Sequence, residues 1–191
     1  MRVIAGKYRH RILKWPDDVK HIRPTKDRIR EAIFGALGDI EGYAVLDLYS
    51  GSGAMGIEAL SRGASKAIFV DINPIALDIT KENLKSLGIP SYEAQVLALE
   101  DVKAIEKLHN ENYKFDLVIL DHPYKEGKYA DIIYLLKEKD LLSEKCIIVT
   151  ECDRDIQLDV EDFSKVRDYK YGDIRVKILR SYENCYLPRK F

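Results

Sequence analysis

Short apolar runs alternate with longer amphipathic stretches between Tyr43 and Cys152, and this alternation limits the folds open to the chain. The apolar runs have the length of strands, and the longer stretches have helical periodicity. The expected strands are Ala44–Leu48, Ala67–Val70, Ala94–Ala98, Phe115–Leu120 and Ile147–Thr150. The expected helices are Ala54–Ser61, Pro74–Leu87, Val102–His109 and Tyr129–Lys137. Strands that alternate with helices predict an α/β fold with a parallel, doubly wound sheet.

The two ends of the chain depart from this alternation. Lys165–Lys170 and Ile174–Leu179 are strand-like runs joined by a turn, so we expect a hairpin whose last strand runs antiparallel to its neighbours. Arg2–Ala5 and His10–Leu13 predict a second hairpin with a turn at Gly6-Lys7, and a helix is expected from Pro24-Thr25 to about Leu37. We therefore divide the chain into an N-terminal arm with its helix, residues 1–40, and a main domain, residues 41–191.

The net charge of −1 conceals a strong asymmetry. Residues 1–30 contain ten Lys or Arg and three Asp, whereas residues 31–191 contain 21 basic and 29 acidic side chains. A basic arm on an acidic body indicates an anionic partner that is met through one end of the molecule. A solvated charged tail is the alternative. Tyr8, Ile12 and Trp15 interleave with the charges, which favours a folded hairpin that contacts phosphates.

The composition also argues against several classes of protein. No apolar run approaches the roughly 18–20 residues of a membrane span, and the N-terminus lacks the apolar core of a signal peptide. The cysteines, Cys146, Cys152 and Cys185, are not clustered as metal ligands. We therefore expect a cytoplasmic protein with no membrane contact and no metal, and a monomer, because no coiled-coil or apolar interface stripe is visible.

A glycine-rich segment, residues 46–56, joins the first expected sheet strand to its helix. Glycines allow a tight turn and let a ligand approach the N–H groups of the helix. Gly51, Gly53 and Gly56 match the dinucleotide-binding pattern, so a nicotinamide cofactor is one candidate. S-adenosylmethionine (SAM) is the other. Asp47 favours SAM, because a carboxylate here suits the ammonium group of a methionine moiety and would repel a pyrophosphate.

Two further strand ends carry carboxylates. Asp71 ends the second strand and could accept hydrogen bonds from both ribose hydroxyls of either cofactor. Glu100-Asp101 follow the third strand, where methyltransferases commonly contact an adenine amino group. The sequence does not decide between these two residues, and one of them could serve only as a helix cap. Helix capping is also the simpler alternative for Asp47 and Asp71.

The tetrapeptide Asp121-His122-Pro123-Tyr124 directly follows the apolar strand Phe115–Leu120. It resembles the Asp-Pro-Pro-Tyr motif of methyltransferases that modify exocyclic amines of nucleobases. Such an amine is a poor nucleophile because its lone pair is delocalised into the ring. Asp121 and the main-chain carbonyl of His122 are candidate acceptors for its N–H groups, and Tyr124 offers a flat surface for the base. A strand end followed by a proline turn is the alternative.

Several segments share a resemblance to one family over nearly the full length of the chain. They are Arg2–Arg9, Arg23–Phe34, Leu46–Gly53, Gly56–Ala64 and Tyr171-Gly172-Asp173. In these segments the chain resembles the 16S rRNA (guanine-N2) methyltransferases, small-subunit methyltransferase D. The resemblance implies a Rossmann-like SAM-dependent methyltransferase fold with a seven-stranded, mostly parallel sheet. It also implies methylation of the exocyclic N2 of one guanine in 16S rRNA of the small ribosomal subunit.

The motifs and the resemblance together predict three sets of site residues. The expected catalytic residues are Asp121, His122, Pro123 and Tyr124. The expected SAM-binding residues are Asp47, Tyr49, Ser50, Gly51, Ser52, Gly53, Gly56, Asp71, Ile72, Glu100 and Asp101. The expected RNA-binding residues are Arg2, Lys7, Tyr8, Arg9, Arg11, Arg23, Thr25, Arg28 and Arg30.

The expected reaction is direct methyl transfer to a guanine that is swung out of its RNA context and stacked on Tyr124. Positioning of the two reactants would lower the barrier by on the order of 7–11 kcal/mol at best. Three other functions remain open: methylation of an adenine amine in DNA or RNA, a non-catalytic role in ribosome assembly, and nicotinamide-dependent oxidoreduction. His122 is the only support in the sequence for the non-catalytic role.

His122 departs from the family motif, which usually has proline at this position. Its carbonyl remains an acceptor, but proline would pre-set the backbone, and histidine adds a titratable group beside the target amine. We expect His122 to leave activity in place and to steepen its pH dependence. A His122→Pro variant whose pH–rate profile matches that of the parent would contradict this hypothesis.

Overall fold

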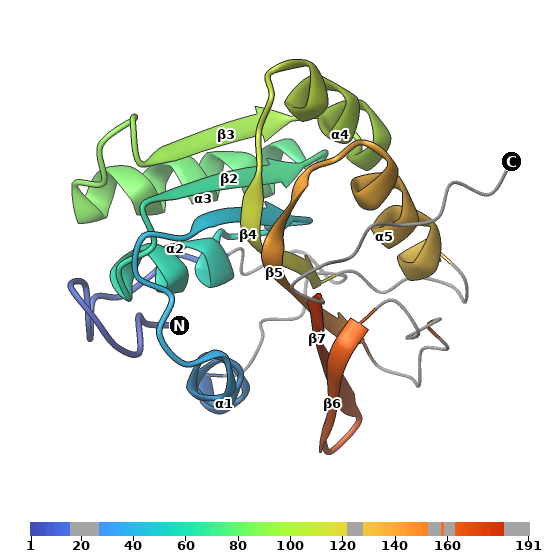
Figure 1. Cartoon of the computed structure of the whole chain (residues 1–191). Helices are drawn as coiled ribbons and strands as arrows, with labels where there is room; N and C mark the ends of the chain where they lie inside the picture. Colours follow the sequence, from blue (N-terminus) through green and yellow to red (C-terminus); the bar gives the residue numbers. More distant parts are fainter. Residues whose placement is uncertain (16–26, 122–127, 153–157, 159–162, 182–191) are drawn as a thin grey trace, which may run out of the picture.

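The computed structural model of the chain describes residues 1–15, 27–121, 128–152, 158 and 163–181. Its centre is a seven-stranded sheet with the order β3-β2-β1-β4-β5-β7-β6 (Figure 1). The strands are β1 (Ala44–Leu48), β2 (Lys66–Asp71), β3 (Ala94–Ala98), β4 (Phe115–Asp121), β5 (Leu142–Cys152), β6 (Phe163–Tyr171) and β7 (Ile174–Ser181). The helices are α1 (Asp27–Leu37), α2 (Ala54–Ser61), α3 (Pro74–Leu87), α4 (Asp101–Asn110) and α5 (Lys128–Glu138). Among the described residues, no helix is both long and apolar enough to cross a membrane.

The strand directions confirm the predicted fold class. Strands β1 to β5 all run parallel to one another, whereas β7 is antiparallel to both β5 and β6. The boundaries of β1, β3, α2 and α3 are those expected from the sequence. Strand β5 begins at Leu142, before the predicted start at Ile147, and its register against β4 shifts between these residues. The added part includes exposed Glu144 and Lys145, so it lacks the apolar pattern that marks a strand.

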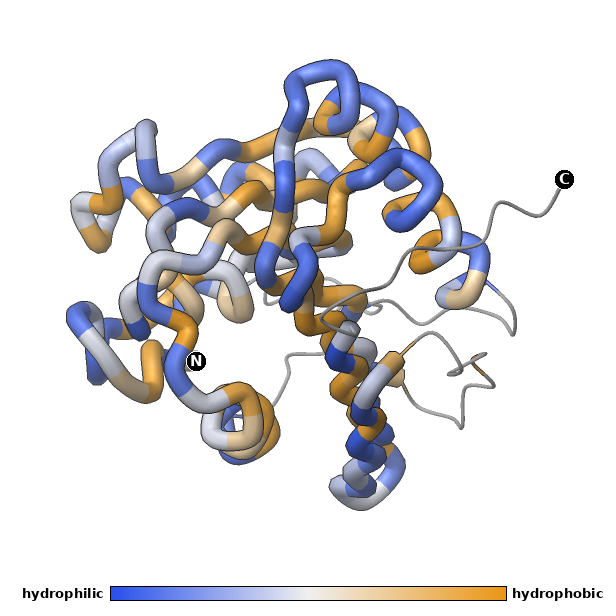
Figure 2. The backbone as a smooth tube through the Cα atoms, viewed as in Figure 1, coloured by the Kyte–Doolittle hydropathy of each residue, from blue (hydrophilic) through white to orange (hydrophobic). Residues whose placement is uncertain are grey.

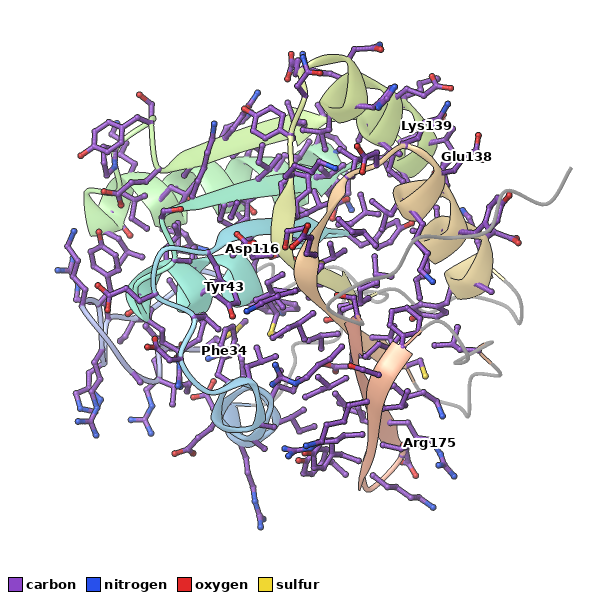
Figure 3. The ribbon with its side chains drawn as sticks, in the orientation of Figure 1. Phe34, Tyr43, Asp116, Glu138, Lys139 and Arg175 are labelled. Atoms are coloured by element: carbon purple, nitrogen blue, oxygen red, sulfur yellow. The ribbon has the colours of Figure 1, made fainter. Side chains whose placement is uncertain are left out.

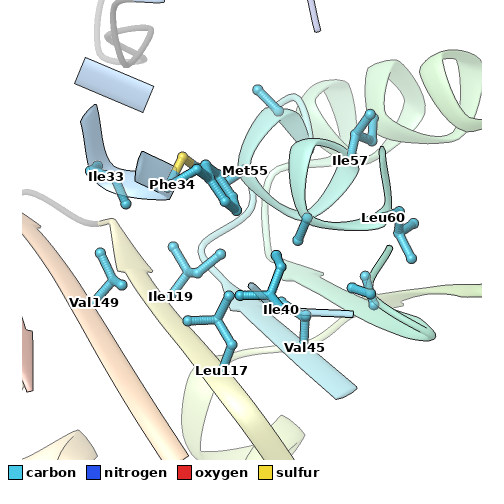
Figure 4. Close-up of a cluster of buried hydrophobic side chains, with 14 of the residues drawn as sticks. Ile33, Phe34, Ile40, Val45, Met55, Ile57, Leu60, Leu117, Ile119 and Val149 are labelled. Carbon is cyan, nitrogen blue, oxygen red and sulfur yellow. The ribbon is translucent and has the colours of Figure 1, made fainter. Parts of the chain in front are cut away.

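Helices cover both faces of the sheet, with α1, α2 and α3 on one side and α4 and α5 on the other (Figure 1). Figure 2 shows hydrophobic residues gathered along the central strands. On the first side, Leu117 and Ile119 of β4 pack with Phe34 of α1 and Met55 of α2 (Figure 4). Each large apolar side chain buried in this way contributes roughly 1.5–3 kcal/mol. The helix α1, although it precedes the alternating region, therefore shares the core of the main domain.

The N-terminal arm, described over residues 1–15, is held on α2 by two buried polar side chains. The carboxylate of Glu58 accepts hydrogen bonds from the backbone N–H groups of Ile4, at 2.8 Å, and Ala5, at 3.1 Å. Ser61 accepts from the N–H of Tyr8 through its hydroxyl, at 2.9 Å. The carbonyl oxygen of Ser61 accepts from the N–H of Lys7 at 2.7 Å. These bonds stop the arm from acting as a detached tail in the free protein.

The two strands predicted in the arm are reduced to one antiparallel bridge between Arg2 and Ile12. The turn extends from Gly6 to His10 instead of being confined to Gly6-Lys7, and His10 has a left-handed φ of 68°. The physical reason is that several backbone N–H groups of the arm are hydrogen-bonded to α2 and not to the facing segment of the arm. Because the N–H groups of Ile4, Ala5, Lys7 and Tyr8 are hydrogen-bonded to α2, this segment does not form a regular cross-strand ladder.

We predict that Gly6→Ala loosens the arm. A Cβ at position 6 would lie 1.7 Å from the carbonyl oxygen of Ser61, and φ is +78°. Gly38→Ala is the matched control, because its φ is +81° but no atom lies within 4 Å of its added Cβ. Both variants should lose about 1–2 kcal/mol through the left-handed backbone. In urea unfolding, Gly6→Ala should lose more free energy of unfolding than Gly38→Ala. Only Gly6→Ala should make the arm sensitive to limited proteolysis. Equal losses in the two variants would contradict the docked arm.

Candidate functional site

The carboxyl ends of β1, β2 and β4 meet at one edge of the sheet, and the loop from β1 to α2 lies at this edge. Tyr49 opens the loop with a φ of 80°, which is uncommon for a residue with a side chain. The N–H groups of Tyr49 and Ser50 both donate to the carbonyl of Val70 in β2, at 2.9 Å. A strained conformation persists only where its surroundings enforce it. Strand β2 therefore helps to fix the path of this loop.

Gly56 lies in the first turn of α2, against the aromatic ring of Phe69 in β2. A Cβ at position 56 would come within 2.4 Å of that ring and 3.1 Å of the Asp47 carboxylate. Only glycine therefore lets α2 approach the sheet so closely. Gly51, at the tip of the loop, donates its N–H to Asp71 Oδ2 at 2.8 Å. The predicted glycine loop is thus attached to β1 at one end and to β2 at its tip.

Asp47 is the most deeply buried carboxylate at this edge, with 1% of its surface exposed. Its Oδ2 accepts the N–H of Gly56 at 2.8 Å. Its Oδ1 is buried and has no hydrogen-bond partner among the described residues. Burial, and to a smaller extent the charges of Asp121 and Asp71, raise the pKa of Asp47 to about 7. A buried acceptor without a partner is costly, so Asp47 is suited to receive a cationic or hydrogen-bonding ligand.

Four carboxylates from adjacent strands share one face of the sheet at this edge, and we call them the carboxylate row: Asp71, Asp47, Asp121 and Glu151. Asp71 and Asp121 lie two residues beyond the register partners of Asp47, so all three side chains point to the same side. Asp121 pairs in register with Glu151 of β5, which is 8% exposed. The sequence analysis missed Glu151, although an acidic residue after an apolar strand is the signal that also marks Asp71 and Asp121.

The carboxylate row suits an organic cation better than a phosphate. Coulomb repulsion in a partly buried site disfavours an additional negative group. Among the described residues, no group of three or more His, Cys, Asp or Glu side chains is arranged to hold a metal ion.

The structure distinguishes Glu100 from Asp101. Glu100 precedes α4, its side chain is 63% exposed, and it forms an ion pair with Lys103 at 3.0 Å. Asp101 is only 12% exposed, and its Oδ2 accepts from the hydroxyl of Tyr49 at 2.8 Å and from Lys128 Nζ at 3.0 Å. Asp101 is therefore the residue in contact with the glycine loop. Ile72 follows Asp71 and is 69% exposed, which leaves an apolar surface beside the carboxylate row.

Helix α3 supports the glycine loop through two buried side chains that the sequence analysis did not identify. Thr80 donates to the carbonyl of Gly51 at 2.8 Å, and Asn83 Nδ2 donates to the carbonyl of Ser52 at 3.0 Å. Asn83 also bonds the backbone of Lys14 in the arm, accepting from its N–H at 2.7 Å and donating to its carbonyl at 3.1 Å. Asn83 thus joins the glycine loop to the arm directly.

The predicted RNA-binding residues fall into two groups. The exposed residues are Arg2, Lys7, Arg9, Arg11 and Arg28. Tyr8 is 8% exposed and packs into the core, and Arg30 is completely buried. Arg30 donates to the carbonyl of Arg2 and to Asp27 Oδ1, and its Nε lies 4.0 Å from Glu58 Oε2.

Arg30 is therefore corrected from a phosphate-contacting residue to a structural one, because its guanidinium has no exposed surface. A pattern of charges along a helix does not reveal that one basic side chain points inward to meet a buried carboxylate. Five predicted site residues lie outside the described residues, and their roles stay predictions: His122, Pro123, Tyr124, Arg23 and Thr25.

Comparison with known proteins adds independent information. Residues 1–180 match the family described as Conserved hypothetical protein 95. The Bacillus subtilis protein YlbH, provisionally named an rRNA methyltransferase, is 38% identical over 94% of this chain and 98% of its own length. Ribosomal RNA small subunit methyltransferase D of Haemophilus influenzae is 33% identical over 81% of this chain and 80% of its own. The solved structure of Escherichia coli yhhF, provisionally named a methyltransferase, has a TM-score of 0.82 and 28% identity, covering 96% of this chain and 99% of that one.

We predict that Asp47 makes the free protein less stable as the pH rises. Its folded pKa of about 7 lies above the ordinary value of 3.8, so the folded state retains a proton that the unfolded state has lost. Stability should therefore fall between about pH 4 and pH 7, by on the order of 4 kcal/mol at most, since one pKa unit corresponds to about 1.4 kcal/mol.

Urea unfolding of the parent and of Asp47→Asn at pH 5 and pH 8 tests this prediction. Asparagine keeps an acceptor for the N–H of Gly56 but cannot ionise. The parent should lose stability relative to the variant on going to pH 8. Parallel pH profiles in the two proteins would show that Asp47 titrates normally.

Proposed function

The chain belongs to the family of conserved hypothetical protein 95 and the small-subunit methyltransferase D proteins, and on this premise we propose that it methylates the N2 amine of one guanine in 16S rRNA. SAM is the proposed methyl donor. The observation that carries this proposal is the carboxylate row beside a glycine loop, with the unpartnered Oδ1 of Asp47 at its centre. We expect the protein to work in the cytoplasm as a monomer, without a metal ion.

The donor groups at the site fit SAM. Asp47 Oδ1 is the proposed acceptor for the ammonium group of the methionine moiety, because this buried oxygen has no hydrogen-bond partner among the described residues. Asp71 is the proposed acceptor for the ribose hydroxyls. Its Oδ2 already orients the glycine loop by accepting from the N–H of Gly51, and its Oδ1 accepts from the N–H of Asn73. Each oxygen retains a second lone pair. Exposed Ile72 and largely buried Asp101 would face the adenine. A pyrophosphate would instead be repelled by Asp47 and Asp71, which disfavours a nicotinamide cofactor.

Asp121 is the proposed acceptor for the target amine. It ends β4 on the face that also carries Asp47 and Asp71, so the substrate amine would be held beside the cofactor. When bound, SAM supplies an electrophilic methyl group. Asp121 and the carbonyl of His122 would hold the two amine hydrogens, which directs the nitrogen lone pair out of conjugation with the ring. Tyr124 would hold the base by stacking. No general base is required before the transfer, and Asp121 could receive the released proton.

The exposed basic residues of the arm and of α1 are the proposed phosphate contacts. They are Arg2, Lys7, Arg9, Arg11 and Arg28. Lys7 already lies 5.1 Å from the centre of the Tyr8 ring, so its ammonium group is held near the arm surface. Because the arm is fixed on α2 and the glycine loop begins the same helix, RNA bound to the arm would be held at a defined position relative to the cofactor. In this proposal residues 1–40 act as the RNA-binding extension and residues 41–191 as the catalytic domain.

Transfer of labelled methyl from SAM to small ribosomal subunits that lack the modification tests the proposed function. The label should appear in N2-methylguanosine after digestion of the rRNA. Asp121→Ala should reduce transfer by roughly 10²-fold or more, because one of the groups that hold the reacting amine is lost. Binding of SAM to this variant, measured by calorimetry, should remain.

The other outcomes are equally informative. Label in N6-methyladenosine would support methyl transfer from SAM but show that the substrate base is adenine and not guanine. SAM binding without transfer to any rRNA would favour a non-catalytic role in ribosome assembly. Binding of a nicotinamide cofactor in place of SAM would overturn the proposal.

A further inference from the structure

The edge strand β6 carries a basic and aromatic stripe on one face. Lys165, Arg167, Tyr169 and Tyr171 alternate along the strand, so their side chains share one side of the sheet. The register with β7 pairs Arg167 with Ile178 and Tyr169 with Val176, and both partners belong to the core on the side of α1 and α2. The stripe therefore lies on the same side of the sheet as the N-terminal arm.

The stripe leads to the edge of the sheet that carries the carboxylate row. Asp121 pairs with Glu151, Glu151 with Val176, and Val176 with Tyr169, which places these residues in one row across four strands. At a strand spacing of about 4.8 Å, Tyr169 lies roughly 14 Å from Asp121. Tyr171 lies two residues further along β6. The β6–β7 hairpin projects from the rest of the sheet at this end (Figure 1).

The hairpin is a basic region in an otherwise acidic part of the chain. Residues 163–181 contain six Lys or Arg and two Asp, whereas residues 31–162 contain 13 basic and 26 acidic side chains. Asp168 is ion-paired with Lys177 at 2.8 Å and lies 3.7 Å from Arg175, which is labelled in Figure 3, so this acidic charge is already neutralised. Lys165 and Arg167 of the stripe are exposed.

The two tyrosines of the stripe form a rigid flat surface. Their rings are stacked, with centres 6.2 Å apart and an angle of 15° between their planes. Both are half-buried and pack against the core, which limits their rotation. Arg167 Nη1 lies 3.4 Å from the hydroxyl of Tyr169. On β7, Arg180 donates to the carbonyls of Ala36, at 3.3 Å, and Leu37, at 3.0 Å, and so attaches the hairpin to the end of α1.

We infer that the stripe of Lys165, Arg167, Tyr169 and Tyr171 is a second RNA-binding surface, which holds a single-stranded segment of the substrate beside the methylation site. Lys165 and Arg167 contact its phosphates, and the exposed part of the tyrosine pair stacks on a base. This inference rests on the proposed function. Charge complementarity selects RNA as the occupant, since the basic surface adjoins a strongly acidic body, and the aromatic pair gives an unpaired base a stacking surface that a duplex does not use.

The arm and the stripe would act on the RNA from two sides of α1. The arm is anchored on α2 and α3, while the stripe is anchored to the far end of α1 through Arg180. RNA that contacts both would be oriented in two places, which restricts how the target base reaches Asp121. A single basic arm would attract rRNA by charge but would not fix its direction.

The test compares variants that differ only in where charge or aromatic surface is lost. The double variant Lys165→Gln/Arg167→Gln removes two positive charges from the stripe. Lys103→Gln/Lys107→Gln, on α4 at the other face of the sheet, removes the same charge elsewhere. Tyr171→Leu removes the outer ring while keeping an apolar contact with the core, and Tyr171→Phe keeps the ring. Urea unfolding and SAM binding show whether each variant remains folded.

Three results are expected. With unmethylated small subunits, the stripe double variant should raise KM for the RNA substrate with little change in kcat, while the α4 control should resemble the parent. Binding of a short, labelled single-stranded RNA should show a salt dependence lower by about 1.4 in log–log slope, at about 0.7 for each lost phosphate contact. Tyr171→Leu should weaken RNA binding on the order of tenfold, and Tyr171→Phe should not.

The inference is overturned if the stripe double variant keeps the parental KM and salt slope, or if the α4 control loses as much as the stripe variant. Equal losses of RNA affinity in Tyr171→Leu and Tyr171→Phe would show that Tyr171 does not stack on a base. If the parent protein methylates no RNA but its oligonucleotide binding still depends on the stripe, the proposed function fails and the RNA surface stands. If the parent methylates small subunits and the stripe variants are unaffected, the proposed function stands and the RNA surface fails.

Discussion

The hydrogen bond between the buried Asp47 carboxylate and the N–H of Gly56 is the constraint on which the rest of this structure depends. It joins the end of β1 to the first turn of α2, where the positive end of the helix dipole favours a negative group. The ring of Phe69 lies beneath the same turn and leaves room only for glycine. The helix is therefore fixed on the sheet at its first turn, and the loop before it is held beside the carboxylate row.

Because α2 is fixed in this way, one helix positions both parts of the proposed enzyme. Its N-terminus begins at the glycine loop, and Glu58 and Ser61 near its C-terminus hold the arm. Asn83 of α3 makes a second connection, since its side-chain amide bonds both Ser52 and Lys14. A displacement of the arm would therefore also displace the glycine loop. Two short connections between the sites leave little freedom for the arm to move relative to the cofactor.

The distribution of charge separates the proposed cofactor site from the proposed RNA-binding surfaces. Negative charge is concentrated at the carboxylate row, where an organic cation is proposed to bind. Positive charge is placed on the arm and on Lys165 and Arg167 of the stripe, at two separate places on the same side of the sheet. A net charge near zero thus results from two opposite surfaces, each of which suits one of the proposed ligands.

The sequence by itself determined the order and type of the helices and strands in the alternating region, because apolar periodicity and the Asn73-Pro74 helix start are local signals. It also located Asp47, Asp71 and Asp121, because each follows an apolar run at a strand end. Only the tertiary structure decided which side chains face inward. Arg30 belongs to a basic helix by sequence, yet Glu58, 28 residues later, holds it in the core. Glu151 follows an apolar run as Asp71 and Asp121 do, but its place in the carboxylate row is set by the pairing of β4 with β5. The position of the stripe near Asp121 follows from the strand order alone. The sequence could not predict it, because contacts between distant residues leave no periodic pattern.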